Sequence, residues 1–154
     1  MADAPHIMIV EARFYAHISE ELTRGAIAAL DAAGASYERF AVPGAFEIPA
    51  AIRFAVEAAT RGARRERFDG FVALGCVIRG ETTHYDYVCG ESARGLQSLA
   101  LEHNLAIGFG ILTVENDAQA LARARIDRKN KGGEAANACL AMIELKRHLG
   151  VGKR

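Results

Sequence analysis

A histidine, two threonines and an arginine lie within ten residues after a short apolar run, and they carry the clearest chemistry in the chain: Arg79, Thr82, Thr83 and His84. We expect the apolar run, 71–74, to be a buried strand that ends at Gly75 and leads through a turn into a helix. Such a turn offers free backbone N–H groups, hydroxyls and the positive end of a helix dipole, which together favour an anion. An imidazole can give and take a proton near neutral pH, so His84 is a candidate for proton transfer. The threonines can hold a phosphate or can simply cap the helix.

Other side chains could complete such a site. Arg123, on a predicted short helix, could donate two parallel N–H groups to a phosphate, although an arginine on a helix surface is usually solvated. Phe14 and Phe46 fall in predicted turns, where they could stack on a flat heterocycle or pack on the edge of the core. Glu47 lies at a helix start, where an acidic residue also suits the dipole. Cys76 directly continues an apolar strand and is interpreted as a buried small residue rather than a nucleophile.

Two further classes of chemistry receive no support. Lys131 precedes two glycines, but the GxxxxGK[ST] pattern of nucleotide hydrolases is absent. The remaining histidines lie in terminal or helix-surface contexts and are expected to be inert: His6, His17, His103 and His148. No spacing of histidine, cysteine and carboxylates suggests a metal site.

The elements that must position these residues follow from hydrophobic periodicity. Strands are predicted at 7–10, 37–42, 71–74 and 105–112, with residues 11–15 as the exit turn of the first. Helices are predicted from about 16 to 33, 46 to 61, 84 to 104, 116 to 125, and after a charged loop at 127–133 to the C-terminus, where Leu149 is expected to be buried. Gly90 and Gly95 lower the stability of the third helix but permit close packing.

This alternation predicts a single α/β domain over residues 1–154, a three-layer sandwich with a four-stranded parallel sheet of the flavodoxin-like type. Ligands of such sheets bind at the carboxyl ends of the strands. The candidate side chains fall mostly in those exit turns, and this convergence is the main functional signal from the residues themselves.

Composition narrows the partners and the location. Lysine plus arginine equals aspartate plus glutamate at 19 each, which argues against nucleic acid or an anionic membrane as the main partner. No apolar stretch approaches the roughly 20 residues of a membrane span. The N-terminus shows no secretory signal. Three widely spaced cysteines without a CxxC pair make disulfides unlikely and indicate a reducing cytoplasm.

Four blocks of the sequence together resemble the 6,7-dimethyl-8-ribityllumazine synthase family: residues 42–49, 75–87, 109–116 and 130–136. They occur in the family's order and span almost the whole chain. The resemblance implies a transferase of riboflavin biosynthesis. It would condense 5-amino-6-(D-ribitylamino)uracil with 3,4-dihydroxy-2-butanone 4-phosphate, releasing phosphate and water, without a metal or an organic cofactor.

The same resemblance implies a role for each matching position. His84 would be the proton donor and acceptor. Glu81, Thr82 and Arg123 would hold the substrate phosphate, Glu81 through its backbone N–H. Contacts to the ribitylaminouracil would come from Phe14, Ala45, Phe46, Glu47, Cys76, Val77, Ile78, Phe109 and Lys131. Relatives often have threonine in place of Cys76, and a backbone contact would survive that change.

The resemblance also implies assembly into a homopentamer, and in some family members twelve pentamers form a 60-subunit icosahedral shell. Each pocket would be shared, with Phe14, Glu47 and His84 from one subunit and Phe109, Arg123 and Lys131 from the next. Two alternatives stay open at this point. One is a flavodoxin-like module that carries flavin or lumazine without catalysis, and the other is a chiefly structural shell protein.

Overall fold

The computed structural model describes residues 3–64 and 66–152. Four parallel strands form one sheet in the order β2-β1-β3-β4. They are β1 (His6–Ala12), β2 (Ser36–Val42), β3 (Gly70–Ile78) and β4 (Ile107–Val114). The predicted α/β class, with its four-stranded parallel sheet between two helical layers, is confirmed.

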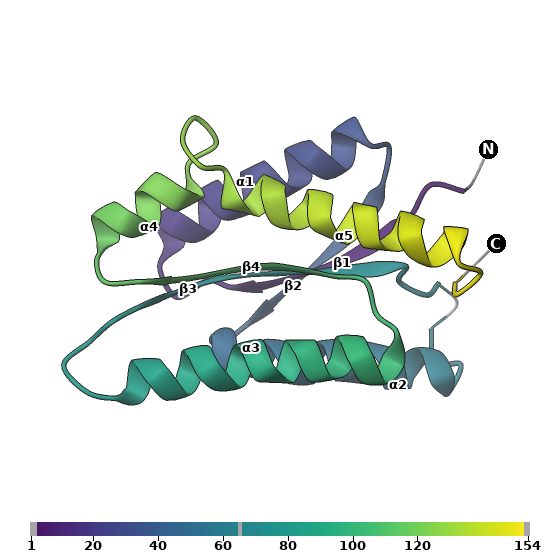
Figure 1. Ribbon diagram of the computed structural model, residues 1–154, viewed down its shortest axis with the longest axis horizontal. Helices are drawn as coiled ribbons and strands as arrows, with labels where there is room; N and C mark the ends of the chain where they lie inside the picture. The colour runs from purple at the N-terminus through teal and green to yellow at the C-terminus, as the bar shows by residue number, and fades with distance from the viewer. Residues whose placement is uncertain (1–2, 65, 153–154) are drawn as a thin grey trace.

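Helices cover both faces of the sheet (Figure 1). One layer consists of α1 (Ala16–Ala32), α4 (Asp117–Ala124) and α5 (Lys131–His148). The other consists of α2 (Ile48–Thr60), which follows the short 3-10 turn η1 (Ala45–Glu47), and α3 (His84–His103). None of the described helices combines the length and the apolar character that crossing a membrane requires.

Side chains of the central strand β1 point alternately to the two faces of the sheet, so this strand contributes to the hydrophobic core on each face. Ile7 and Ile9 are fully buried beneath α1 and α5, whereas Met8 and Val10 face the layer of α2 and α3. Each such aliphatic side chain contributes about 1.5–3 kcal/mol when it is fully buried. Because side chains alternate with a period of two, the pairing register decides which core each residue enters.

The third strand is longer than predicted. It continues past Gly75 to Ile78, because residues 75–78 pair with residues 111–114 of β4. Tertiary pairing overrides the low strand propensity of glycine here. At Gly75 an added Cβ would lie 3.3 Å from the Cβ of Ala12, so the small residue keeps two central strands close. The strand-to-helix turn therefore comprises only residues 79–83.

The predicted charged loop at 127–133 is also corrected. Helix α5 begins at Lys131, and both glycines of this segment lie in its first turn. Their role is close packing, since a Cβ on Gly132 would collide with the backbone carbonyl of Leu22 in α1. Asn130 is the N-cap, and its side chain accepts a hydrogen bond from the Gly133 N–H at 3.3 Å. Leu149 was expected in the core but is 67% exposed.

The two glycines of α3 have different surroundings. A Cβ on Gly95 would lie 2.9 Å from two carbons of the Pro49 ring, so α2 and α3 touch at this point. A Cβ on Gly90 would meet no described atom within 4 Å. Close packing therefore explains Gly95 within the chain and does not explain Gly90.

Replacing Gly95 by alanine should lower the free energy of unfolding by about 1 kcal/mol. The cost of overpacking, about 1–3 kcal/mol, exceeds the gain in helix propensity of about 0.5–1 kcal/mol. Gly90→Ala, the matched control in the same helix, should raise stability by that same gain. Urea unfolding followed by circular dichroism measures both variants, and equal shifts of the two midpoints would contradict the role of the Pro49 contact.

Candidate active site

A cavity of about 510 Å³ opens at the carboxyl edge of the sheet. It gathers the exit turns of β1 and β2, the end of β3 and the first turns of α3, and we call it the rim pocket. It is lined by Phe14, Tyr15, Pro43, Gly44, Ala45, Phe46, Glu47, Cys76, Val77, Ile78, His84, Tyr87 and Val88. The structure thus brings together eight of the residues predicted for the site from the sequence: Phe14, Ala45, Phe46, Glu47, Cys76, Val77, Ile78 and His84.

The floor of the pocket comes from the end of β3. Cys76 is buried, whereas Val77 and Ile78 are half-buried. Burial raises the pKa of the Cys76 thiol to about 12, and the nearby Asp117 carboxylate adds to this shift. The thiol is therefore neutral at physiological pH. This agrees with the interpretation of Cys76 as a buried small residue rather than a nucleophile, because the thiolate is the reactive form.

His84 is the first residue of α3 and is exposed at the pocket. Its ring makes no side-chain hydrogen bond to any of the described residues, so both nitrogens remain available. Thr83, the N-cap, makes no side-chain cap bond, and Thr82 only reaches the His84 N–H at 3.4 Å. A capping role for the two threonines is thus weakly supported, and the helix start is open to an anion.

The turn before His84 is fastened by Arg79. Its guanidinium lies 3.0 Å from a carboxylate oxygen of Glu115, which follows β4, and 3.8 Å from Asp86 in α3. It also stacks over the ring of Tyr85 at 4.4 Å. These contacts link the exit turn of β3 to Glu115 after β4, and they neutralise the Arg79 guanidinium.

The aromatic walls are held less firmly than the floor. Phe14 and Phe46 are 71% and 57% exposed, so their ring faces are available to a flat ligand. The backbone beside Phe46 is better anchored, because the buried Ser92 hydroxyl donates to the Ala45 carbonyl at 2.9 Å. The Phe14 ring meets Tyr15 edge-on, with centroids 4.9 Å apart.

The other predicted residues lie outside the rim pocket. Glu81 and Thr82 are exposed on the turn that precedes His84. Phe109, on the edge strand β4, borders a separate cavity of about 380 Å³ with Gln97 and Met142. Within one chain the site therefore has an aromatic pocket and an imidazole, and the basic residues predicted for it lie elsewhere.

Those basic residues differ in their own contacts. Arg123 donates to the Gln119 carbonyl of its own helix at 3.0 Å, and no described carboxylate forms an ion pair with it. Lys131 is paired with Glu134, with Nζ 2.9 Å from a carboxylate oxygen. The structure thus leaves Arg123 with an unneutralised guanidinium.

Sequence reasoning missed one ionic feature beneath the pocket. Glu11 was assigned to an exit turn, but it lies in β1 and is only 3% exposed. Burial by itself raises the pKa of this carboxyl, yet hydrogen bonds from Arg39, Thr23 and Arg13 outweigh it and hold the pKa below its ordinary value of 4.5. Because the pKa is lower in the folded chain, the stabilisation is complete above pH 4.5 and is lost as the pH falls through the lowered value.

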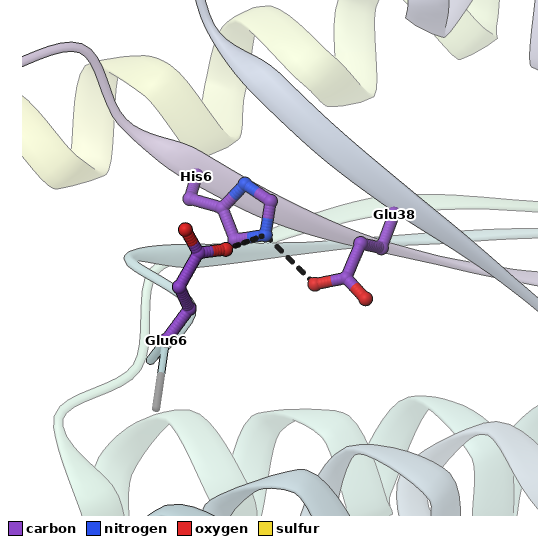
Figure 2. Close-up of side chains that lie close together, drawn as sticks. All are labelled: His6, Glu38 and Glu66. Atoms are coloured by element: carbon purple, nitrogen blue, oxygen red, sulfur yellow. Dashed lines mark hydrogen bonds and ion pairs between the residues drawn. The ribbon is translucent and has the colours of Figure 1, made fainter. Parts of the chain in front are cut away.

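A second cluster lies at the opposite edge of the sheet, where β1 begins. Figure 2 shows His6 between the carboxylates of Glu38 and Glu66, with Nε2 2.8 Å and 3.4 Å from them. The geometry resembles a cation site, but the Arg64 guanidinium lies 2.7 Å from the same Glu38 oxygen that faces His6. The positive charge is already supplied by a side chain. His6 therefore has a structural role, in line with its expected lack of chemistry.

Comparison with known proteins agrees with the geometry. The family model for 6,7-dimethyl-8-ribityllumazine synthase matches residues 4–147. The chain is 59% identical over 148 residues to 6,7-dimethyl-8-ribityllumazine synthase 1 of Rhizobium meliloti, covering 96% of this chain and 95% of that protein.

Two further relatives carry the name 6,7-dimethyl-8-ribityllumazine synthase. That of Agrobacterium fabrum is 57% identical over 146 residues, covering 95% of this chain and 97% of the relative. That of Sphingopyxis alaskensis is 56% identical over 147 residues, covering 96% and 99%. Because a family model matches nearly the whole described fold and the relatives are similar along almost their entire length, the chain belongs to the 6,7-dimethyl-8-ribityllumazine synthase family.

Proposed function

We propose that the rim pocket is where this chain carries out the lumazine synthase reaction. As a member of the family, the chain is a transferase of riboflavin biosynthesis. It condenses 5-amino-6-(D-ribitylamino)uracil with 3,4-dihydroxy-2-butanone 4-phosphate to give 6,7-dimethyl-8-ribityllumazine, phosphate and water. The observation that carries the assignment to this pocket is the gathering of Phe14, residues 45–47, residues 76–78 and His84 around one cavity.

Two aromatic residues and the end of β3 would bind the ribitylaminouracil. Phe14 offers an exposed ring face to the flat pyrimidinedione, and residues 45–47 and 76–78 offer backbone groups to the ring and the ribityl chain. In the pocket of a neighbouring subunit, Phe109 and Lys131 would complete this binding site. Holding two substrates in one orientation can lower a barrier by about 7–11 kcal/mol, so we expect positioning to contribute much of the rate.

His84 would move the protons of the condensation. The 5-amino group attacks the ketone and forms a carbinolamine, which loses water to give an imine. Phosphate leaves by elimination, and ring closure expels the last water. Each step needs a proton delivered or removed, and an exposed imidazole without a competing side-chain partner in the described chain can do both.

The phosphate would be held by Glu81, Thr82 and Arg123. Glu81 and Thr82 precede the open start of α3, beside His84. Arg123 does not line the rim pocket of its own chain, so we propose that a neighbouring subunit supplies it. The role is supported because no described carboxylate pairs with this guanidinium, and its N–H groups other than the one bound to the Gln119 carbonyl can donate to a phosphate.

Assembly into a homopentamer would create the shared pockets. Large apolar side chains remain exposed on α2 and α3, among them Phe54 and Leu101, each 71% exposed. Phe54 borders an apolar cavity of about 560 Å³ beside the edge strand β2. Contiguous exposed apolar surface of this kind is typical of an interaction site. Twelve such pentamers would form the 60-subunit shell that the family resemblance implies.

Two broader assignments complete the proposal. Residues 1–154 form one lumazine synthase domain, which the match over residues 4–147 supports. The cytoplasm is the proposed location, because the cysteines of this chain are free: Cys76, Cys89 and Cys139.

Replacing His84 by alanine should lower kcat by about 100-fold or more, the usual worth of a positioned acid–base group. Steady-state assays of lumazine formation at saturating substrates measure the effect. His103→Ala, at the other end of the same helix, is the control and should retain full turnover. Unchanged turnover of His84→Ala would remove the imidazole from the chemistry.

Arg123→Ala should raise the KM for the butanone phosphate at least about tenfold, since charge-assisted phosphate bonds are among the strong ones. The KM for the ribitylaminouracil should change much less. Arg125→Ala is the matched control, because Arg125 lies two residues away and is paired with Asp127 at 2.8 Å. An equal rise of both constants would contradict the phosphate role.

Mixing tests whether the pocket is shared. At butanone phosphate concentrations below the native KM, oligomers reassembled from equal amounts of His84→Ala and Arg123→Ala chains should be more active than the mean of the two variants alone, because about a quarter of the interfaces then combine both native side chains. Sedimentation velocity of the native protein should give about five times the chain mass of 16.6 kDa for a pentamer, or about sixty times for a shell. A monomer, or mixed oligomers no more active than the mean of the two variants, would overturn the shared pocket.

A further inference from the structure

The buried carboxylate of Glu11 forms an ionic cluster directly below the turn that carries Phe14. Its Oε1 accepts from the Thr23 hydroxyl at 2.9 Å and from the guanidinium of Arg13 at 2.7 Å. Arg39 reaches both carboxylate oxygens, at 2.7 Å and 3.0 Å. Glu11 does not line the rim pocket, so its charge must act through the groups that it binds.

Arg13 is the member of this cluster that lies in the turn. Besides Glu11, its guanidinium contacts Glu20 of α1 at 3.2 Å, so one side chain spans the step from β1 into α1. The step is also anchored at Tyr15, which packs against the core and whose carbonyl accepts the Ser19 N–H at 2.9 Å. The other side-chain hydrogen bonds that hold it are weak. Tyr15, the N-cap of α1, makes no side-chain cap bond, and the Ser19 hydroxyl reaches the Ala12 carbonyl only at 3.4 Å.

Phe14 depends on this turn for its place. Its ring is 71% exposed and has one aromatic neighbour, Tyr15, which is itself part of the turn. Packing against the core therefore cannot set the position of the ring. The backbone between Arg13 and Tyr15 must set it instead.

We infer that Glu11 is a positioning residue for the aromatic wall of the pocket, acting through Arg13 on Phe14. The inference rests on the proposed function, in which Phe14 stacks on the pyrimidinedione. When the ion pair between Glu11 and Arg13 is lost, the Phe14 ring is no longer held where it can stack on the pyrimidinedione. Binding of the planar substrate then weakens. Binding of the butanone phosphate, which does not use this wall, is unaffected.

The test uses Arg13→Met, which removes the link and leaves Glu11 bound by Arg39 and Thr23, so the buried carboxylate keeps partners and the fold is preserved. The KM for the ribitylaminouracil should rise about 3- to 10-fold, the range expected for loss of one aromatic stack. The KM for the butanone phosphate and kcat should stay within about twofold of the native values.

Arg39→Met is the matched control: it removes two hydrogen bonds from Glu11 on the far side of the turn. It should lower the melting temperature and leave both KM values unchanged.

Phe14→Ala and the double variant Arg13→Met/Phe14→Ala separate the possible failures. If Arg13 acts through the ring, the double variant has the same KM for the ribitylaminouracil as Phe14→Ala alone. A native KM in Phe14→Ala would overturn the stacking role and the inference with it. A raised KM in Phe14→Ala with a native KM in Arg13→Met would overturn the inference and leave the proposed function standing. A double variant weaker than Phe14→Ala would show that Arg13 contacts the substrate itself, which also overturns the inference.

Discussion

Parallel pairing of β1 with β3 is the constraint on which the site depends. Glu11 of β1 is level with Leu74 of β3, so the two central strands end at the same edge and their exit turns meet there. A slip of one residue would move every β1 side chain to the opposite face. Glu11 would then enter the apolar core between the sheet and the layer of α2 and α3, where no described cation waits for it. The register therefore fixes both the pocket and the charge below it.

The pocket has an uncharged floor and carries its ionisable side chains at the rim. Its floor is made of strand residues whose side chains are apolar or, at Cys76, held neutral by burial. Ionisable groups lie at the rim, where His84 and Glu47 are exposed. Backbone groups at the floor keep their geometry when side chains change, whereas the proton transfer proposed for His84 takes place at the rim. A chain with no net charge thus concentrates its electrostatics in a few positions.

Periodicity was sufficient to predict the sheet and the layers, because four apolar runs alternate with helices. It also placed Phe14, Phe46, Glu47 and His84 in turns at one edge of the sheet, whereas the contacts from Ala45 and from residues 76–78 were implied only by the family resemblance. It failed where tertiary contacts override local preference. Gly75 reads as a strand end, but pairing with β4 carries the strand on to Ile78. Gly132 reads as a loop residue, yet it lets α5 approach α1. Glu11 was predicted to be a turn residue. Its partner Arg39 lies on another strand, too far away in the sequence for any local pattern to reveal the pair.

Charge compensation within the chain supports the proposal that a neighbouring subunit supplies the cation for the phosphate. Of the arginines in the turns around the pocket, Arg13 is held by Glu11 and Glu20, and Arg79 by Glu115 and Asp86. Both cations are already neutralised, so a phosphate would compete with two carboxylates for either of them. Arg123 carries no such partner among the described residues and lies away from its own pocket. Under the proposed function, a second copy of the chain would bring this guanidinium to the rim, where it would neutralise the phosphate of the substrate.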